Sequence, residues 1–450
     1  MTTAHIPSAE KLRASAHEDA NRCVQCGYCL PVCPTYASMG KETASPRGRI
    51  NLVKLAAEGK IDILEHMAGP LDLCLGCRAC EVACPVGVPY GRLLESAKEA
   101  IADEIRRKSE SGEPDRPSGS AGSLKEGLKR AALEHLFPHP GRLRLAGSLL
   151  RLYQKSGAAR LARASGVIRR ISPAMAAFEQ VLPEAESPRT RPKAGARYPA
   201  VGEKKATVAF FSGCLMDAMM HRVNRLSVEL LRLAGCEVVI PEHQKCCGAL
   251  HAHQGDMETA RKLAGANIAA FEATGADWYV NNAGGCGAML QEYALLFKGD
   301  AAMEERAAAF AAKSRDISWV LHRLGPLPFK KEWKVTITYQ DSCHLRNVQK
   351  VHEEPRALIR SIPGAAYAEC EGAETCCASG GIYNLLHFEE SMRILDDKML
   401  KVKDTNASVL VTANPGCLLQ MKLGIKRSGL GGRMRAVHLV EALAEACGIE

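Results

Sequence analysis

Eight cysteines near the start of the chain form two copies of one spacing pattern, which we call a comb. In each comb, three cysteines separated by two residues are followed, after three residues, by a fourth cysteine and a proline. The combs are Cys23, Cys26, Cys29, Cys33 with Pro34, and Cys74, Cys77, Cys80, Cys84 with Pro85. Three thiolates on one short loop suit three corners of an iron–sulfur cube. Disulfides fit poorly, because cysteines this close in sequence seldom meet disulfide geometry. Zinc sites usually show paired cysteines instead of this comb.

The same spacing occurs in bacterial two-cluster ferredoxins, in which the fourth cysteine binds the other cluster. By that pattern one [4Fe–4S] cluster takes Cys23, Cys26, Cys29 and Cys84, and the other takes Cys33, Cys74, Cys77 and Cys80. The crossing ties the two loops together and keeps the clusters close, as electron transfer requires. Between the combs, residues 45–55 read as a loop followed by an amphipathic helix. Residues 1–108 are therefore predicted to form a helical ferredoxin domain.

The length and composition indicate a larger, multidomain protein. A chain of 450 residues exceeds a lone ferredoxin and suggests about two to four domains. It shows neither a secretory signal nor a run of about 18 apolar residues that would predict a transmembrane helix. Nineteen cysteines in such a chain favour metal ligation in a reducing compartment over disulfides. We therefore expect a cytoplasmic protein.

Residues 109–204 contain no cysteine and are predicted to form a basic helical linker segment. Ser109–Ser123 and Pro183–Pro199 have the composition of loops. Between them, residues 142–170 carry eight Arg or Lys residues and no acidic residue, interleaved with leucines. This pattern is typical of a solvated helix packed on its own domain, or of a surface that docks on an acidic partner or an anionic membrane. Nucleic acid is disfavoured, because no recognition motif accompanies the charge.

From about residue 205 the chain repeats itself. Residues 205–332 and 333–450 each contain one cysteine, then an adjacent pair, then a cysteine after glycine. These are Cys214, Cys246, Cys247 and Cys286 in the first repeat, and Cys343, Cys376, Cys377 and Cys417 in the second. The three landmarks are offset by 129, 130 and 131 residues.

Each repeat places its first and last cysteines after short apolar runs, with helical patterns between them. Strands alternating with helices predict a parallel sheet, and the cysteines then fall at its carboxyl edge, where open α/β folds bind ligands. The predicted fold is thus α+β and multidomain, with an N-terminal helical two-[4Fe–4S] ferredoxin domain followed by a duplicated α/β cysteine-rich module. The duplication also predicts two similar lobes related by a pseudo-twofold axis.

The repeats resemble the cysteine-rich (CCG) domains of the heterodisulfide reductase family, whose motif binds an unusual iron–sulfur cluster or zinc. That motif ends in Cys-x-x-Cys, but Ala283 and Asn414 occupy the first of those positions here, and Ala378 replaces the motif's glycine in the second repeat. Four thiolates per repeat still suffice for tetrahedral zinc or a [4Fe–4S] cube. The resemblance therefore implies a further iron–sulfur cluster or zinc in the repeats, and its identity stays open.

Other candidate residues lie near this pattern. His251, His253 and His344 follow repeat cysteines and are candidate ligands, partners of ligands or proton carriers, although a polar loop role is commoner for such histidines. Three cysteines lie outside the pattern and are expected to pack in the core. They are Cys236, Cys370 and Cys447.

Several runs resemble the iron–sulfur subunits of bacterial glycolate oxidase (glycolate dehydrogenase). They are also similar to iron–sulfur subunits of lactate-utilisation and anaerobic glycerol-3-phosphate dehydrogenase complexes. The runs are Cys33–Tyr36, Ser45–Ile50, Cys246–His251, Asn281–Ala288, Asp341–Leu345 and Asn414–Cys417. The resemblance covers residues 20–90 and 205–420, and the Gly-Cys endings after Ala283 and Asn414 are its part most specific to glycolate oxidase.

This resemblance implies an electron relay. A flavin-containing partner subunit would oxidise glycolate to glyoxylate, and this chain would pass electrons through its clusters to a quinone or another membrane acceptor, either in the cytoplasm or peripherally on the inner face of the cell membrane. The sequence has no glycine-rich dinucleotide motif and no hydrolase motif, and hydride removal from a 2-hydroxy acid is flavin chemistry. We therefore expect no catalytic residue and no substrate oxidation by the chain alone. Three alternatives stay open: a lactate or glycerol-3-phosphate complex, a disulfide reductase, and a scaffold with zinc in the repeats.

Overall fold

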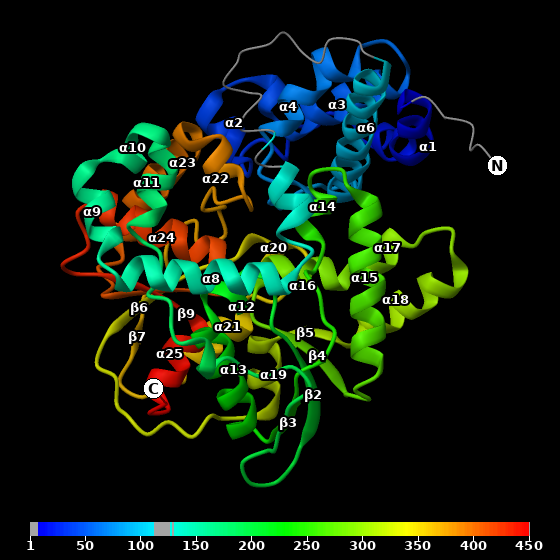
Figure 1. The fold of residues 1–450 in the computed structure, drawn as a ribbon. Coiled ribbons are helices and arrows are strands. Elements are labelled where there is room, and N and C mark those ends of the chain that lie inside the picture. Colours follow the sequence, from blue (N-terminus) through cyan, green and yellow to red (C-terminus); the bar gives the residue numbers. More distant parts are fainter. Residues whose placement is uncertain (1–7, 112–126, 128–129, 450) are drawn as a thin grey trace. The chain divides into compact units, whose positions relative to one another are not determined.

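The computed structural model describes residues 8–111, 127 and 130–449. The chain folds into two compact units (Figure 1), one holding residues 1–134 together with 248–260 and the other holding residues 135–247 and 261–450. The first unit is helical, and the second is built around two sheets. The predicted combination of a helical domain and a duplicated α/β module is confirmed. Among the described residues, no helix is long and apolar enough to cross a membrane.

Three longer helices form the frame of the first unit. They are α1 (Ser8–Asn21), α3 (Pro46–Ala57) and α6 (Tyr90–Ser111). Their apolar faces meet in one core that includes Leu12, Val53 and Leu93. Shorter segments carry the cysteine loops: α2 (Pro34–Met39), η1 (Glu42–Ala44), η2 (Ile63–Met67), α4 (Ala68–Asp72) and α5 (Ala79–Val82).

The helix predicted between the combs is α3, and its start explains the local sequence. The Ser45 side chain caps the helix by accepting a hydrogen bond from the Gly48 amide at 2.9 Å. Pro46 occupies the first turn, where its missing N–H costs nothing. Gly48 is required for space, because a Cβ there would collide with the Glu42 carbonyl oxygen. These residues fix where α3 begins between the two cysteine loops.

The first sheet of the second unit has the strand order β1-β3-β2-β4-β5. Its strands are β1 (Arg197–Tyr198), β2 (Ala206–Phe211), β3 (Cys236–Val239), β4 (Trp278–Asn281) and β5 (Ser314–Asp316). The strands β2 to β5 are parallel, and β1 pairs antiparallel at the edge. The apolar runs at 207–211 and 278–280 are thus strands, as predicted, and they form the adjacent interior strands β2 and β4.

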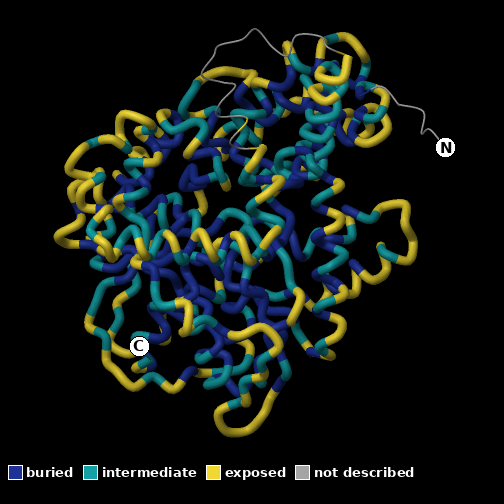
Figure 2. Tube along the Cα trace, in the orientation of Figure 1, coloured by how far each residue is buried: buried dark blue, intermediate teal, exposed yellow. Residues whose placement is uncertain are grey.

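The second sheet repeats this core with the order β7-β6-β8-β9, and all four strands are parallel. They are β6 (Thr336–Gln340), β7 (Ala366–Tyr367), β8 (Val409–Thr412) and β9 (Arg435–His438). Ile337 pairs with Val409 as Val208 pairs with Trp278. Figure 2 shows the central strands of both sheets as buried. The predicted duplication is therefore present in the strand order as well as in the cysteine spacing.

Helices connect and cover these strands. Those of the first repeat are α12 (Leu215–Met219), α13 (His221–Leu233), α14 (Ala249–Ala252), α15 (Met257–Glu272), α16 (Gly284–Gln291), α17 (Tyr293–Leu296), α18 (Ala301–Lys313) and α19 (Ile317–Leu324). Those of the second are α20 (Cys343–Asn347), α21 (Glu353–Arg360), α22 (Tyr383–Leu386), α23 (Phe388–Asp404), α24 (Pro415–Arg427) and α25 (Leu439–Ala446). Cys236, Cys370 and Cys447 lie in the shared hydrophobic core, as expected.

The two repeats pack closely through small residues. Helix α16 of the first repeat contacts α20 of the second. A Cβ on Gly284 would collide with Ser342 Oγ, and one on Gly287 would lie 2.5 Å from the Gln349 amide nitrogen. Glycine therefore lets two cysteine-bearing helices, one from each repeat, approach each other.

Within the described residues of the second unit, the basic stretch between the combs and the repeats includes four helices. They are α8 (Pro140–Lys155), α9 (Ala158–Ser165), α10 (Val167–Ile171) and α11 (Pro173–Glu179). Helix α8 packs on α12, where a Cβ on Gly147 would collide with the Ala218 carbonyl oxygen. The predicted loop at 183–199 holds only the short turn η3 (Pro188–Thr190) and strand β1. Of the loop predicted at 109–123, residues 109–111 end α6, and 112–123 lie outside the described residues.

Candidate iron–sulfur and metal sites

Two cavities in the first unit are lined by the comb cysteines. One is lined by the first predicted ligand set, Cys23, Cys26, Cys29 and Cys84, and Cys80 also reaches it. The other is lined by the second predicted set, Cys33, Cys74, Cys77 and Cys80. The fold thus brings each fourth cysteine beside the first three cysteines of the other comb. The assignment of these thiols as ligands stays a prediction.

The linings of both cavities fit an iron–sulfur cluster. Their donors are thiols, and among the described residues no histidine, aspartate or glutamate lines either cavity. The remaining walls are largely apolar, with Pro46 and Tyr90 shared by both cavities. Across residues 8–111, 127 and 130–449, no three Cys, His, Asp or Glu side chains are arranged to hold a single metal ion. An all-thiol set that is not arranged around a single ion suits a cluster better than zinc.

Both cysteine loops use the same backbone device. Gln25 and Gly27 in the first comb have positive φ angles of 58° and 87°, and Gly76 and Arg78 at the equivalent positions have 62° and 61°. Each comb therefore places glycine at only one of its two left-handed positions, although glycine adopts this conformation most easily. The turns let nitrogen donors approach sulfur, as when the Gly76 amide donates to Cys74 Sγ at 3.4 Å. Such donors stabilise thiolate charge.

Arg49 supplies a buried positive charge beside the second cavity. Its Nε donates to a carbonyl of α4 at 2.8 Å, and both terminal nitrogens donate to Thr35 Oγ1 at 3.1 Å. Thr35 Oγ1 lies 3.3 Å from Cys33 Sγ. Burial alone would lower the pKa of Arg49, but negative charge at Cys74, Tyr90 and Cys33 outweighs it and raises that pKa. Arg49 therefore stays charged and offsets the charge of the surrounding thiolates.

Arg49 lies in the run Ser45–Ile50, which carries part of the family resemblance, but the sequence alone assigned it no role. The available signal was its position on the buried face of α3, four residues before the fully buried Val53. A charged residue at such a position needs a partner of opposite charge or a set of acceptors. Here the acceptors are Thr35 and a main-chain carbonyl, and the opposite charge comes from the cysteines.

The first repeat brings its four cysteines together at the carboxyl ends of β2, β3 and β4, as predicted from their positions after strands. Cys214 Sγ lies 3.6 Å from Cys246 Sγ. Cys247 hydrogen-bonds to both Cys246 and Cys286. The pKa of Cys214 is raised well above that of a free thiol, first by its hydrogen bond to Cys246 and then by burial. The four thiols thus touch in series, and their binding of metal stays a prediction.

Neutral side chains hold these loops in place. Asn267 accepts from the Lys245 amide at 2.7 Å and donates to the Cys246 carbonyl at 2.9 Å. The hydroxyl of Tyr293, which is fully buried, donates to the Cys247 carbonyl at 3.0 Å. Together these contacts fix the backbone of the adjacent cysteine pair through neutral side chains.

The second repeat gathers its cysteines in the same way. Cys377 hydrogen-bonds to Cys376 and to Cys417, while the charge of Cys343 acts on Cys417. The pKa of Cys377 is well below that of a free thiol, because Cys376 and then Cys417 donate to it and outweigh its burial. Asn414, which replaces a motif cysteine, donates to Cys417 Sγ at 3.6 Å. The lost ligand position thus contributes a hydrogen-bond donor.

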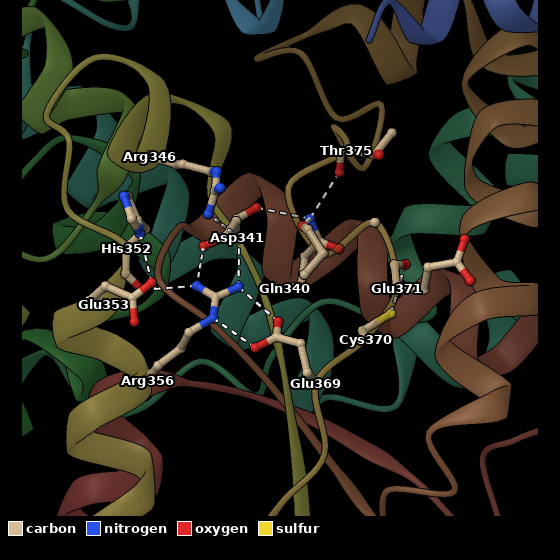
Figure 3. Close-up of polar contacts among 12 residues, drawn as sticks. Gln340, Asp341, Arg346, His352, Glu353, Arg356, Glu369, Cys370, Glu371 and Thr375 are labelled. Carbon is tan, nitrogen blue, oxygen red and sulfur yellow. Dashed lines mark hydrogen bonds and ion pairs between the residues drawn. The ribbon is translucent and has the colours of Figure 1, made fainter. Parts of the chain in front are cut away.

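A buried ion pair anchors the strand end that leads to Cys343 (Figure 3). Both terminal nitrogens of Arg356 donate to the Asp341 carboxylate at 2.9 Å, and Arg356 also pairs with Glu369 at 2.9 and 3.0 Å. Arg346 makes a third contact with Asp341 at 3.3 Å. Asp341 is 2% exposed, so its charge depends on these partners.

Two further side chains brace the loop before the adjacent cysteine pair of this repeat. Gln340 donates from Nε2 to the Ala373 and Thr375 carbonyls at 2.9 and 3.1 Å. Lys398 donates from Nζ to the carbonyls of Gly372, Ala373 and Thr375 at 2.6, 3.2 and 2.7 Å. Burial lowers the pKa of Lys398, and negative charge at Cys370, Cys377 and Cys376 opposes this. The lysine places a buried amine beside the cysteine loop.

The three candidate histidines have different surroundings. His251 is fully buried, and its Nε2 lies 2.9 Å from the Leu133 carbonyl, while His253 lies 3.5 Å from Glu95. Both histidines belong to the first unit. His344 Nδ1 would lie 3.8 Å from a Cβ on Gly285, so this imidazole of the second repeat reaches the turn that carries the last cysteine of the first repeat.

Three family models match the chain. A 4Fe-4S dicluster domain matches residues 19–88, and a cysteine-rich domain matches residues 208–291 and 337–422. The third, described as the linker region of the glycolate oxidase iron-sulfur subunit, matches residues 125–182. That linker contributed nothing to the family resemblance found from the sequence, because its basic amphipathic pattern matches no motif with a known chemistry.

Several curated proteins are similar over most of the chain. The probable glycolate oxidase iron-sulfur subunit of Bacillus subtilis is 49% identical over 95% of this chain and 94% of its own length. The glycolate oxidase iron-sulfur subunit of Escherichia coli is 28% identical over 94% and 93%. Lactate utilization protein A of Oceanobacillus iheyensis is 32% identical, over 52% of this chain and 96% of its own length. Matches of this extent and pattern show that the chain belongs to the family of glycolate oxidase iron–sulfur subunits.

Proposed function

We propose that this chain is the electron-transferring subunit of a glycolate oxidase complex. Flavin-containing subunits would oxidise glycolate to glyoxylate, and this chain would carry the electrons towards a quinone or another membrane acceptor. The proposal rests above all on two all-thiol cavities in a chain that is 49% identical to a probable glycolate oxidase iron-sulfur subunit. The complex would work in the cytoplasm, peripherally on the inner face of the cell membrane.

The comb cysteines would hold two [4Fe–4S] clusters in the crossed arrangement, and such clusters supply one-electron transfer when bound. The chain's own residues would do the rest. Arg49 offsets thiolate charge beside Cys33 and Cys74. The amides of Gly76 and Val88 donate to sulfur at 3.4 Å. Fixed donors and a fixed cation favour electron acceptance, because they stabilise added negative charge without rearrangement.

The cysteine-rich repeats would provide a further metal site or a docking module. Their candidate ligands are Cys214, Cys246, Cys247 and Cys286 in residues 205–332, and Cys343, Cys376, Cys377 and Cys417 in residues 333–450. A further iron–sulfur cluster and zinc are both compatible with four thiolates. The ferredoxin domain would span residues 1–108, with the basic linker at 109–204.

Lactate is the second candidate substrate of the complex, because lactate utilization protein A is 32% identical over part of the chain. That relative aligns with 52% of this chain, whereas the glycolate oxidase relative aligns with 95%. The wider match favours glycolate. The choice of substrate would lie in the flavin subunits, since the chain itself shows no flavin motif.

Reconstitution tests this proposal. The chain, purified anaerobically, should not oxidise glycolate, lactate or glycerol 3-phosphate alone, and adding the flavoprotein subunits should give glycolate-dependent reduction of a quinone analogue. Cys26→Ser and Cys77→Ser should stop quinone reduction while glycolate still reduces the flavin. Turnover by the chain alone would contradict the proposal, as would full activity of both variants. If the reconstituted complex preferred lactate, lactate would replace glycolate as its proposed substrate.

A further inference from the structure

Helix α8 presents an apolar stripe to solvent. Leu145, Leu149 and Leu152 are 61%, 57% and 64% exposed, and their spacing of four and three residues places them on one side of the helix. The opposite side carries the buried Leu143 and Gly147, with which α8 packs on α12. The stripe is therefore not a packing face of the described second unit.

The next three helices also carry exposed apolar side chains. Leu161 on α9, Val167 and Ile171 on α10 and Met175 on α11 are 73%, 46%, 76% and 54% exposed. Successive helices contact one another, so the exposed residues belong to one folded segment (Figure 1). Single exposed leucines are ordinary, but exposed apolar side chains on four successive helices point to an interaction site. We call these seven side chains the apolar face of α8–α11.

Unpaired basic residues accompany this face. Residues 142–170 contain no acidic residue. Arg144 and Arg163 have partners, at 2.7 Å from Asp217 and 2.8 Å from Glu179. Four other basic residues are exposed and make no ion pair within the part of the chain that the structure describes. These are Lys155, Arg160, Arg169 and Arg170.

The chemistry of this surface favours lipid over protein. The seven exposed side chains are aliphatic or methionine and include neither tryptophan nor tyrosine, the aromatic residues that dominate the strongest contacts in protein interfaces. Short basic amphipathic helices with leucine on one face are typical of segments that lie in the plane of a membrane interface. The unpaired cations would meet the phosphate groups of anionic lipids.

We propose that α8–α11 form the surface by which this protein lies on an anionic phospholipid bilayer. The apolar face enters the boundary between headgroups and acyl chains, and the four unpaired cations lie at the level of the phosphates. This inference rests on the proposed function only for its purpose, which is to bring the subunit to a membrane acceptor. Lipid binding is measured without turnover, so the two proposals can fail separately.

Vesicle cosedimentation of the full chain, purified anaerobically, tests the inference. We expect binding to vesicles of phosphatidylcholine mixed with phosphatidylglycerol, and at least about tenfold weaker binding to pure phosphatidylcholine. High salt should weaken the binding to mixed vesicles, because it screens the exposed cations. Equal binding to both kinds of vesicle, or binding to neither, would overturn the proposal.

Matched variants locate the surface. Leu149→Gln combined with Leu161→Gln should weaken binding to mixed vesicles by about tenfold or more, because two inserted leucines are lost. Leu400→Gln is the control, since Leu400 on α23 is also exposed, at 65%. The double variant Arg160→Gln with Arg169→Gln should bind mixed vesicles more weakly, and salt should affect its binding less. Lys403→Gln is the control for charge, because Lys403 lies on α23 with Leu400, and it should leave binding unchanged.

All variants should keep the iron content of the parent protein and its glycolate-dependent reduction of a soluble dye with the flavoprotein subunits. Unchanged lipid binding by the leucine variant would contradict the proposal. If the parent protein ignored lipid and the leucine variant failed to assemble with the flavoprotein subunits, the lipid assignment would be wrong and the face would belong to a protein interface.

Discussion

The two cysteine-rich repeats hold the same cysteine pattern with different supporting side chains. Asn267 and Lys398 stand 131 residues apart, as do Cys286 and Cys417. Both are buried, and both brace the loop that leads into the adjacent cysteine pair. One is a neutral amide, and the other is an amine that donates to three carbonyls.

The strand ends before the first cysteines differ in the same way. In the first repeat the Ser212 amide donates to Gln244 at 2.9 Å, and Asn224 donates to the Ser212 carbonyl at 2.8 Å. In the second repeat the equivalent position is Asp341, held by Arg356. A network of amides and hydroxyls in one repeat is thus replaced by ion pairs in the other.

The difference shows that the strand and cysteine framework does not dictate the electrostatics around the thiols. Duplication kept the backbone geometry, while the supporting positions diverged. A nearby cation stabilises thiolates, so Lys398 makes the second repeat better suited to an anionic thiolate centre than the first. The two repeats should therefore respond differently when equivalent supports are removed.

The largest effect is expected from Arg356→Met. It would leave Asp341 buried without its bidentate partner, so we expect a loss of about 3–5 kcal/mol in the free energy of unfolding. Denaturant titration of the full chain measures this. Arg427→Met is the matched control, because the Arg427–Asp396 pair is partly exposed and should contribute only about 0–1 kcal/mol. Equal losses in the two variants would refute the importance of the buried pair.

A smaller loss is expected from Lys398→Met, which removes the three hydrogen bonds that the buried amine donates to carbonyls of the cysteine loop. We expect about 3 kcal/mol of destabilisation and less metal retained by the full chain during chelator challenge. Asn267→Leu in the first repeat should cost only about 1–2 kcal/mol. If Lys398→Met left both stability and metal retention at the parent values, the charged support would have no role.

The N-cap residues of α19 and α25, Asp316 and His438, should give the two repeats opposite dependences of stability on pH. Burial lowers the pKa of His438 to about 4 from 6.5. The neutral imidazole therefore contributes stability that is fully present above about pH 6.5 and is lost as the pH falls towards 4, by up to about 3 kcal/mol. In His438→Asn the free energy of unfolding should therefore fall less between pH 7 and pH 4 than it does in the parent protein. The same loss of stability in variant and parent would show that His438 does not cause it.

Asp316, the corresponding cap in the first repeat, should act in the opposite sense. Burial raises its pKa to about 6 from 3.8, so its buried charge lowers stability above pH 6 and this penalty fades as the pH falls towards 4. Asp316→Asn can keep the bond from the Ser318 amide. The variant should be more stable at pH 7 by about 3 kcal/mol, and the gain should disappear near pH 4. A gain independent of pH would contradict the titration of Asp316.

The smallest effect is expected from Tyr293→Phe. The hydroxyl joins Asn267 to the Cys247 carbonyl, and its removal should cost about 1 kcal/mol. The position 131 residues later is Gly424, so the second repeat has no equivalent hydroxyl. Denaturant titration measures the loss, and Tyr279→Phe, which keeps the ring in the same aromatic cluster, is the control. Equal losses in the two variants would remove the special role of Tyr293.

Local spacing carried most of what could be predicted from the sequence. The combs, the strands at 207–211 and 409–411, and the cysteines after strand ends depend on short-range periodicity, and the fold bears out the helical domain and the duplicated module. The roles of Arg49 and Lys398 could not be predicted, because they depend on which carbonyls and thiols the folded chain brings near them. The basic amphipathic pattern of the linker could be predicted from the sequence, but which of its apolar side chains face solvent is known only from the folded chain.

One segment departs from any simple division by sequence. Residues 248–260 follow the adjacent cysteine pair of the first repeat but belong to the first unit. There Gly255 has a φ of 86°, and a Cβ on it would collide with the Lys98 carbonyl oxygen of α6. This contact joins residues more than 150 positions apart, so no local pattern could reveal it.

Iron and acid-labile sulfide analysis, combined with electron paramagnetic resonance of the dithionite-reduced chain, tests the central claim most directly. Anaerobically purified protein should contain about eight iron atoms from the combs, plus any bound by the repeats. Cys77→Ser should remove one [4Fe–4S] signal, whereas Cys376→Ser should leave both comb signals intact. A colourless, sulfide-free protein, or one in which Cys77→Ser changes neither iron nor spectrum, would contradict the account.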